Sequence, residues 1–244
     1  KTAQKVAAPE CQGPALLLHA GNMVQLVEVV LPRADRVWLR PPGAVEGVRS
    51  GAAGVGVGEL SRLASGALAD ATRRACACYA RERSQHPLPE LLEVSSAAAL
   101  AHCSGGRPEA VRSAVLEMVH SVVELHAEVH LHAPPCLELV IPAVVEARWE
   151  QLASALRGST GAADPAAGGS GGPQLLLDLS YLEAVLAGVM TPAAREVCRG
   201  LKGPLVAAAG GAGDGGGGGG GPGVAGLLQR ELKRTQLNWL CLAG

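Results

Sequence analysis

The sequence predicts an all-α protein, an elongated stack of antiparallel helices that form a rod-like helical bundle with Gly-rich loops. Apolar residues return with a four-three spacing, which places them along one face of a helix. No stretch alternates apolar and polar residues for long enough to indicate a strand. Glycines and prolines separate the periodic segments, as expected between helices.

Four segments carry this spacing, and each predicts an amphipathic helix. Their apolar stripes are Leu16, Ala20, Met23, Val27 and Val30; Val111, Val115, Met118, Val122, Leu125 and Val129; Leu175, Leu179, Leu182, Leu186 and Val189; and Leu228, Leu232, Thr235, Trp239 and Leu242. Weaker helical segments lie at about 59–83 and 89–102, and a further one follows Pro135.

Prolines and glycines predict where several helices begin and end. Thr191 followed by Pro192 is an N-cap with proline at the first helical position, so a helix stops near Met190 and a short one starts. Gly200 and the pair Gly203-Pro204 should end that short helix. Pro142 should kink or divide the helix that contains it.

Three segments are rich in glycine, at 43–58, 158–173 and 206–226, and are predicted to be loops. The last contains an uninterrupted run from Gly215 to Gly221, which is typical of a flexible connection. These breaks separate helices and need not separate domains.

Composition limits the classes of function. The chain has 244 residues and a net charge of -1, which gives no global attraction to nucleic acid. No apolar run reaches the roughly 18 residues of a spanning helix, and no signal peptide opens the chain. Because it begins at Lys1, we expect it to be a piece of a longer chain. An odd number of scattered cysteines suits reduced thiols in an intracellular protein. They are Cys11, Cys76, Cys78, Cys103, Cys136, Cys198 and Cys241.

The segment HAEVH, residues 126–130, resembles a zinc site at first reading. His126 and His130 have the i, i+4 spacing of a zinc-binding helix, but Glu128 lies on the opposite side of that helix. Its acids therefore cannot share an ion with these histidines, and we expect His126 at a packing border. The same interpretation applies to the other histidines of this region and near the N-terminus, and the acids should be solvated. They are His19, His120 and His132, with Glu117 and Glu124.

Other candidate motifs are incomplete. Cys76 and Cys78 lack the second pair that a zinc or redox site needs, so we expect them to be packing residues. The segment GAAGVGVGEL, residues 51–60, has Glu59 where a phosphate loop needs a cation, and we interpret it as a loop. No G-x-S-x-G elbow supports a hydrolase. The sequence thus predicts no catalytic, cofactor-binding or metal-binding residue.

Three basic clusters are candidate binding surfaces. Acids are interspersed in them and no aromatic residues interleave, which argues against nucleic acid. The last cluster lies near Trp239 on an amphipathic helix, where contact with an anionic lipid surface is the alternative to a solvated helix face. The clusters are Arg73-Arg74, Arg81-Glu82-Arg83 and Arg230-Glu231-Leu232-Lys233-Arg234.

From about residue 88 onwards the sequence resembles the C-terminal region of exocyst complex component 2, the Sec-five subunit. The stretch ELHAEV resembles a core of that family, and a V-E-A-type stretch, Val144-Val145-Glu146-Ala147, follows. QLLLDLSYLEAVLAGVMTPAAREVCRGLKG is similar to the next helix, its proline-containing break and a short helix beyond. The chain closes on a similar motif of Leu228, Glu231, Leu232, Thr235, Asn238 and Cys241.

The resemblance implies two regions and a mechanical role. Residues 1–87 form a helical segment of unassigned family, and residues 88–244 form the C-terminal helical bundle. The family implies a non-catalytic subunit of a vesicle-tethering complex, which is cytoplasmic and peripheral at the plasma membrane and on secretory vesicles. Its partners would be other exocyst subunits, bound by helical packing, without cofactor, nucleic acid or small-molecule substrate. The alternatives are a helical scaffold of another trafficking complex and a histidine-based zinc protein.

Overall fold

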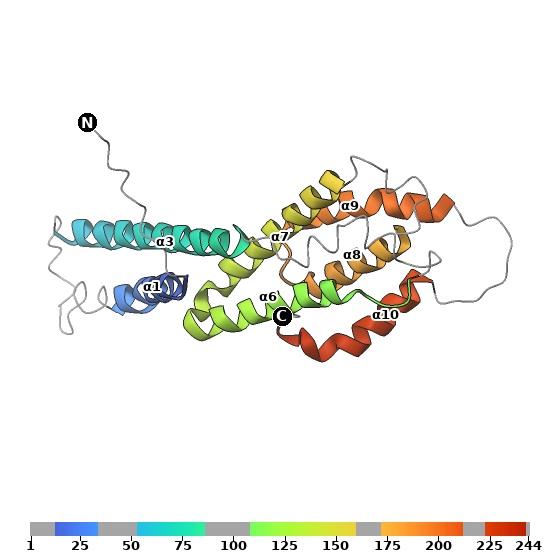
Figure 1. Ribbon diagram of the computed structural model, residues 1–244. Helices are drawn as coiled ribbons and strands as arrows, with labels where there is room; N and C mark the ends of the chain where they lie inside the picture. Colours follow the sequence, from blue (N-terminus) through green and yellow to red (C-terminus); the bar gives the residue numbers. More distant parts are fainter. Residues whose placement is uncertain (1–12, 34–52, 86–107, 160–171, 212–222, 243–244) are drawn as a thin grey trace, which may run out of the picture. The chain divides into compact units, whose positions relative to one another are not determined.

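The computed structural model describes residues 13–33, 53–85, 108–159, 172–211 and 223–242, and these residues form helices without any strand. The predicted all-α class is therefore confirmed (Figure 1). The elements are α1 (Gly13–Gln25), η1 (Leu26–Val30), α3 (Ala53–Gln85), α6 (Ser113–His132), η3 (Pro134–Cys136), α7 (Leu137–Ser159), α8 (Gly172–Leu186), α9 (Pro192–Gly211), α10 (Val224–Thr235), η4 (Gln236–Asn238) and η5 (Leu240–Leu242). The predicted helix at 89–102 lies outside the described residues.

The chain is organised in two compact units. Unit 1 comprises Lys1–Glu82 and Glu128–Val140, and unit 2 comprises Arg83–Ala127 and Ile141–Gly244. The long helices α3, α6 and α7 therefore contribute residues to both units. The boundary between residues 87 and 88 that the sequence suggested remains a prediction.

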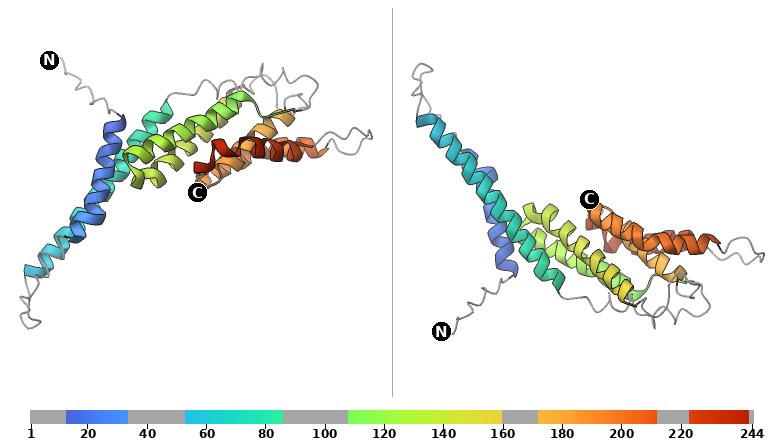
Figure 2. Two further views of the ribbon diagram at one scale, coloured as in Figure 1. Left: turned by 90° about the horizontal axis from the view of Figure 1, so that it is seen from below. Right: turned by 90° about the horizontal axis from the view of Figure 1, so that it is seen from above.

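Unit 1 is built where α1 packs closely against α3 and the connection after α6 (Figures 1 and 2). A Cβ atom added to Gly13 would lie 3.3 Å from the ring of Tyr79, and one added to Gly21 would lie 3.2 Å from the Cβ of Ala133. The buried residues of α1 are Gly13, Leu17, Ala20 and Gly21. Of the stripe predicted here, only Ala20 is buried. The contact face combines Leu17 and Ala20 with Gly13 and Gly21, and a search for apolar residues does not count the glycines.

One helical stretch of the described residues is long and apolar enough, by length and composition, to cross a membrane. It runs from Gly13 to Arg33 with a mean hydropathy of 1.4 over its most apolar window, of which 17% is buried. The uninterrupted apolar run that the sequence prediction required is absent, because His19, Gln25 and Glu28 lie within the helix. Core helices of soluble proteins have the same length and composition, so these two properties alone assign no membrane segment.

Helix α3 begins earlier than predicted. Its first residue is Ala53, so residues 53–58 of the predicted loop at 43–58 are helical, and the interpretation of 51–60 as a loop is wrong from Ala53 onwards. Extending an existing helix adds one hydrogen bond per residue fixed, so a long helix can absorb glycines that would prevent nucleation. Among those side chains of α3 that the structure describes, the buried ones include Thr72, Ala75, Cys76, Tyr79 and Ala80.

Helix α6 confirms the predicted stripe most fully. All six predicted residues are buried, with exposures between 0% and 7%, and Val111 lies just before the helix. The third stripe is also buried from Leu175 to Leu186, whereas Val189 is half-buried in the turn after α8. The four-three spacing thus identified core residues of α6 and α8 correctly.

Helix α8 packs against both α9 and α10 and provides the centre of unit 2 (Figure 2). Its residues are buried on almost every side, with six consecutive buried positions from Gln174 to Leu179. The set continues with Tyr181, Leu182, Val185 and Leu186. A helix in this position must satisfy its polar side chains inside the protein.

Helix α9 begins as predicted but does not end as predicted. The side chain of Thr191 accepts a hydrogen bond from the N–H of Ala194 at 3.1 Å, which confirms the N-cap before Pro192. Gly200 and Gly203-Pro204 do not end the helix, which continues to Gly211 and includes residues 206–211 of a predicted loop. Pro204 removes one backbone hydrogen bond and its ring crowds the carbonyl of Gly200, but the apolar contacts around buried Leu205 favour continuation.

The other loop predictions meet the structure only at their edges. Helix α7 extends to Ser159 and α8 starts at Gly172, so residues 158–159 and 172–173 are helical. Residues 160–171 and 212–222, including the run Gly215–Gly221, lie outside the described residues. Pro142 does not divide α7, which is continuous from Leu137 to Ser159.

The close approach at Gly21 predicts opposite effects for the same substitution at two helical glycines. Gly21→Leu should lower the free energy of unfolding by about 1–3 kcal/mol because the new side chain overpacks against Ala133. Gly66→Leu should raise it by up to about 1 kcal/mol, because Gly66 faces open space in a helix. Urea unfolding followed by circular dichroism measures both. Equal effects of the two substitutions would contradict the packing described for α1.

Candidate functional site

The residues of the zinc-like motif lie at the protein surface or at the border of a packed face. His126 is half-buried at the edge of the stripe formed by Leu125 and Val129, and His130 is exposed. His120 Nε2 lies 3.2 Å from Glu124 Oε1, and both side chains are 69% exposed. Within the described ranges, no three His, Cys, Asp or Glu side chains are grouped so that they could hold a metal ion. That this region has no catalytic or metal-binding role stays a prediction.

The two neighbouring cysteines of α3 have different environments. Cys76 is buried, as a packing residue should be, whereas Cys78 is exposed. The packing prediction therefore holds for Cys76 and is wrong for Cys78, because positions two residues apart face different sides of a helix. Interaction with a third cysteine, Cys136, and burial raise the pKa of the Cys76 thiol. The sequence spacing did not reveal this pairing.

Two arginines of the basic cluster on α10 share one carboxylate within the protein, that of Glu231. Arg234 contacts the buried carboxylate of Glu231 at 2.6 Å, and the Nε of Arg230 lies 3.8 Å from the same residue. Hydrogen bonding to Glu231 raises the pKa of Arg234. Arg230 also donates to the backbone carbonyl of Glu109. Both arginines remain more than half exposed, in agreement with a solvated helix face.

A buried ion pair anchors the start of α6 to α8. Arg112 Nε lies 2.5 Å from Asp178 Oδ2, and the backbone N–H of Arg112 donates to Asp178 Oδ1 at 3.2 Å. Gln174 donates both to the carbonyl of Ala110 at 2.9 Å and to Asp178 at 3.1 Å. Asp178 is fully buried, and its burial raises the pKa of its carboxyl group, although Arg112 acts in the opposite direction.

A second polar contact joins α8 to α10. The hydroxyl groups of Tyr181 and Thr235 lie 2.6 Å apart, and Thr235 also donates to the carbonyl of Glu231. Burial raises the pKa of Tyr181. The buried face of α10 is Leu227, Glu231 and Thr235, so the predicted stripe is shifted by one residue at Leu228 and Leu232. Its members Thr235 and Leu242 are buried as predicted. The displaced apolar residues Leu228, Leu232 and Trp239 are only half-buried.

Helix α9 is joined to α7 and α8 in the same way. Thr191 Oγ1 donates to Glu146 Oε2 at 2.5 Å while it caps α9. The Nζ of Lys202 lies 2.5 Å from Glu183 Oε2 on α8. These pairs were missed from sequence because each depends on the mutual placement of two helices. For the ion pair of Asp178 with Arg112, the sequence offered one signal, which is a charged residue within the mostly apolar segment QLLLDL.

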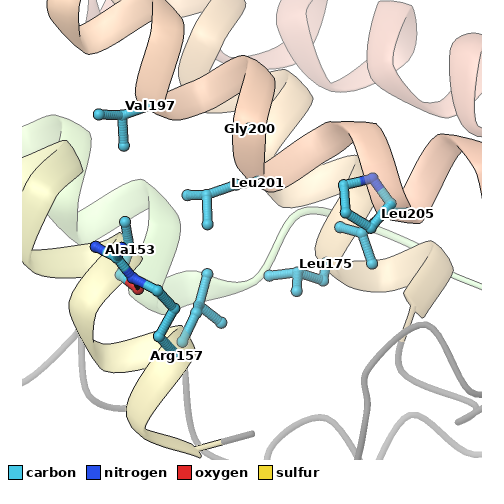
Figure 3. Close-up of a pocket in the computed structure, with 9 residues that line it drawn as sticks. Ala153, Arg157, Leu175, Val197, Gly200, Leu201 and Leu205 are labelled. Atoms are coloured by element: carbon cyan, nitrogen blue, oxygen red, sulfur yellow. Dashed lines mark hydrogen bonds between the residues drawn. The ribbon is translucent and has the colours of Figure 1, made fainter.

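A pocket of about 420 Å³ opens between α7, α8 and α9 (Figure 3). Its lining is almost entirely apolar and comes from three helices. The lining residues are Ala153, Leu156, Arg157, Leu175, Val197, Gly200, Leu201, Pro204 and Leu205. A Cβ atom added at Gly200 would meet nothing within 4 Å, so this glycine leaves the pocket open.

Two polar groups belong to residues that line this apolar pocket, the backbone carbonyl of Gly200 and the side chain of Arg157. Pro204 has no N–H, so the carbonyl of Gly200 lacks the partner that an α-helix normally supplies four residues later. Arg157 lies at the pocket and its Nε donates to the carbonyl of Ala153 at 3.1 Å. Such a pocket, apolar with a few polar groups at defined places, suits one bulky side chain that also carries a hydrogen-bond donor.

Comparison with known proteins places most of the described helices in one family. The family model described as "Exocyst complex component Sec5" matches residues 84–242. Exocyst complex component SEC5A of Arabidopsis thaliana is 28% identical over 106 residues, which are 43% of this chain and 10% of that protein. SEC5B of the same plant is 30% identical over 99 residues, or 41% of this chain and 9% of that protein. The matches thus span about a tenth of each relative. No solved structure matches.

Removal of the buried carboxylate should destabilise unit 2. Asp178→Ala leaves the guanidinium of Arg112 without its buried counter-charge and should lower the free energy of unfolding by about 3–5 kcal/mol. Asp70→Ala removes an exposed partner of Arg73 and should change it by less than about 1 kcal/mol. Urea unfolding of the two variants gives the comparison. Similar losses in both would contradict the anchoring role of Asp178.

The raised pKa of Asp178 also predicts the sign of a pH effect. The folded protein binds this proton more tightly than the unfolded chain, so the stability contributed by Asp178 is greatest below its ordinary pKa of 3.8. This contribution falls as the pH rises through the raised folded-state pKa. The unfolding free energy of the wild type minus that of Asp178→Asn should therefore decrease as the pH rises over that interval. A difference that grows with pH would mean that attraction by Arg112 exceeds the cost of burial.

Proposed function

Because the chain belongs to the Sec5 family of exocyst components, we propose that it is a non-catalytic subunit of the exocyst that tethers secretory vesicles to the plasma membrane before fusion. The observation that carries the proposal is the family match over residues 84–242, which includes α6 to α10. The chain covers about a tenth of its curated relatives, so the activity of the whole complex is part of the proposal.

The mechanism would be mechanical. Polar contacts between helices, such as Asp178 with Arg112 and Tyr181 with Thr235, fix the helices in one register. A bundle held in this way can transmit force without internal rearrangement, which is what a tether requires. It needs no cofactor and turns over no substrate. We place the protein in the cytoplasm, peripheral at the plasma membrane and on vesicles.

Assembly would use apolar surface that the bundle itself leaves uncovered. The pocket between α7, α8 and α9 is open at Gly200, and half-buried Leu228 and Leu232 on α10, with Trp239 after it, provide further apolar surface. Because this chain lacks Phe and has few other aromatic residues, a large aromatic anchor would come from the partner. We infer that a helix of another exocyst subunit inserts a large apolar side chain into the pocket, since large aromatic anchors dominate many protein interfaces.

Filling the pocket tests this proposal without removing any packing contact. Gly200→Leu places a side chain in open space within a helix, so folding should be unchanged or slightly strengthened. The tagged protein should then recover at least one exocyst subunit several-fold less efficiently in quantitative mass spectrometry of affinity-purified complexes. Gly66→Leu is the matched control, because Gly66 is also a helical glycine in open space and does not line the pocket.

Three outcomes distinguish a failure of the docking site from a failure of the proposed tethering function. Recovery of all exocyst subunits at wild-type levels with Gly200→Leu would exclude the pocket as a docking site. Absence of exocyst subunits from the complexes of the unmodified protein would overturn the tethering function itself, and recovery of another trafficking complex would identify the protein as a scaffold of that complex.

A further inference from the structure

The pocket between α7, α8 and α9 has an aliphatic floor and an exposed rim (Figure 3). The floor consists of the buried lining residues, which are Ala153, Leu156, Leu175 and Leu205. The rim consists of exposed lining residues, Gly200 and Pro204 on α9 and Arg157 on α7. A side chain that enters therefore meets apolar groups at its tip and polar groups where it passes the rim.

The backbone carbonyl of Gly200 selects among the side chains that could enter. Pro204 has no N–H with which to bond this carbonyl within α9, and water can serve it while the pocket is empty. An occupant displaces that water. A purely apolar side chain such as leucine or phenylalanine would then leave the carbonyl without a donor, which weakens binding.

Tryptophan meets these demands better than the other large side chains. Its indole is a large apolar body that carries one N–H donor and no acceptor. The hydroxyl oxygen of tyrosine is also an acceptor and would need a donor of its own among aliphatic groups. The pocket volume of about 420 Å³ lies within the range of protein sites that enclose most of a small ligand, roughly 300–1,000 Å³.

Arg157 determines the charge that suits the rim. Among the described lining residues it alone is charged, and its Nε donates to the carbonyl of Ala153, which holds the side chain along α7 (Figure 3). A guanidinium has more N–H donors than this one bond uses. Acids of the two other helices already contact bases, Glu183 with Lys202 and Glu196 with Arg199. The rim is therefore complementary to a carboxylate on the partner.

We propose that the partner helix at this pocket carries a tryptophan, whose indole N–H donates to the carbonyl of Gly200, and an aspartate or glutamate one helical turn away, which pairs with Arg157. This inference rests on the proposed docking of another exocyst subunit at the pocket. It adds the chemistry by which that subunit is recognised.

A neutral probe tests the tryptophan part on the purified chain without any partner. N-acetyltryptophanamide should shift the methyl NMR signals of floor residues Leu156, Leu175 and Leu205 in a saturable titration. The matched analogue is N-acetyl-3-benzothienylalaninamide, in which sulfur replaces the indole N–H. It should bind roughly fivefold more weakly or worse, because it cannot donate to the carbonyl. Gly200→Leu should abolish binding of both compounds, whereas Gly66→Leu should leave both titrations unchanged.

Charge variants of Arg157 test the acidic part in affinity-purified complexes. Arg157→Glu should lower recovery of the same exocyst subunit that Gly200→Leu loses, by several-fold, whereas Arg157→Lys keeps the charge and should retain most of it. Arg62→Glu is the control, because Arg62 is exposed on α3 and does not line the pocket. Arg157→Glu should still bind the neutral N-acetyltryptophanamide, which verifies that its pocket is intact.

A photo-reactive amino acid at exposed Ser154, next to Ala153 in the chain, identifies the partner segment. The cross-linked exocyst peptide should contain a tryptophan with an acidic residue three or four positions away. A cross-linked peptide without tryptophan would contradict the proposal. Tighter binding of octanoate than of N-acetyltryptophanamide would identify a site for lipid chains and also overturn it.

Failure of this recognition chemistry differs from failure of the tethering function. If the unmodified protein recovers no exocyst subunit, the tethering function is wrong, even where N-acetyltryptophanamide binds the pocket. If exocyst subunits are recovered but the benzothienyl analogue binds as tightly as the indole, the tryptophan assignment is wrong. If Arg157→Glu recovers every subunit at the wild-type level, the acidic residue is wrong. In both of these cases the tethering function stands.

Discussion

Burial of α8 on nearly every side is the constraint on which unit 2 depends. A helix in such a position cannot leave its polar side chains in water, so Gln174, Asp178 and Tyr181 each require an internal partner. Those partners come from the chain before α6 and from α10, which fixes where both segments lie. Apolar contacts alone would stabilise the bundle, but they would not select one register between helices as strictly as paired polar groups do.

Much of the fold follows from periodicity, and its failures have identifiable causes. Every residue of the stripe predicted on α6 is buried, although the buried face also includes Ala114 and Val119. On α1 the buried face is displaced towards Gly13 and Gly21, where small size rather than hydrophobicity permits contact. Pro204 was expected to end a helix, yet packing at Leu205 keeps α9 continuous. Local signals are therefore reliable for the core and weaker for glycine contacts and helix ends.

The candidate site could be predicted only in part, because its contacts join distant parts of the chain. The sequence correctly directed attention to the order of the helices and to the closing motif, in which Glu231 and Thr235 are buried. It could not pair Thr235 with Tyr181, or Cys76 with Cys136, since both pairs depend on how helices pack. The pocket at Gly200 was equally hidden, because it arises from a helix that continues past two expected breaks.

The central role of α8 is tested most directly by native-state hydrogen exchange, resolved to single amides. If α8 is the centre of unit 2, the amides from Leu175 to Leu186 should exchange most slowly in that unit, through its global unfolding. The amides of α10, which has exposed residues along most of its length, should exchange faster through local opening. Exchange of α8 at the same rate as α10, or faster, would contradict the account.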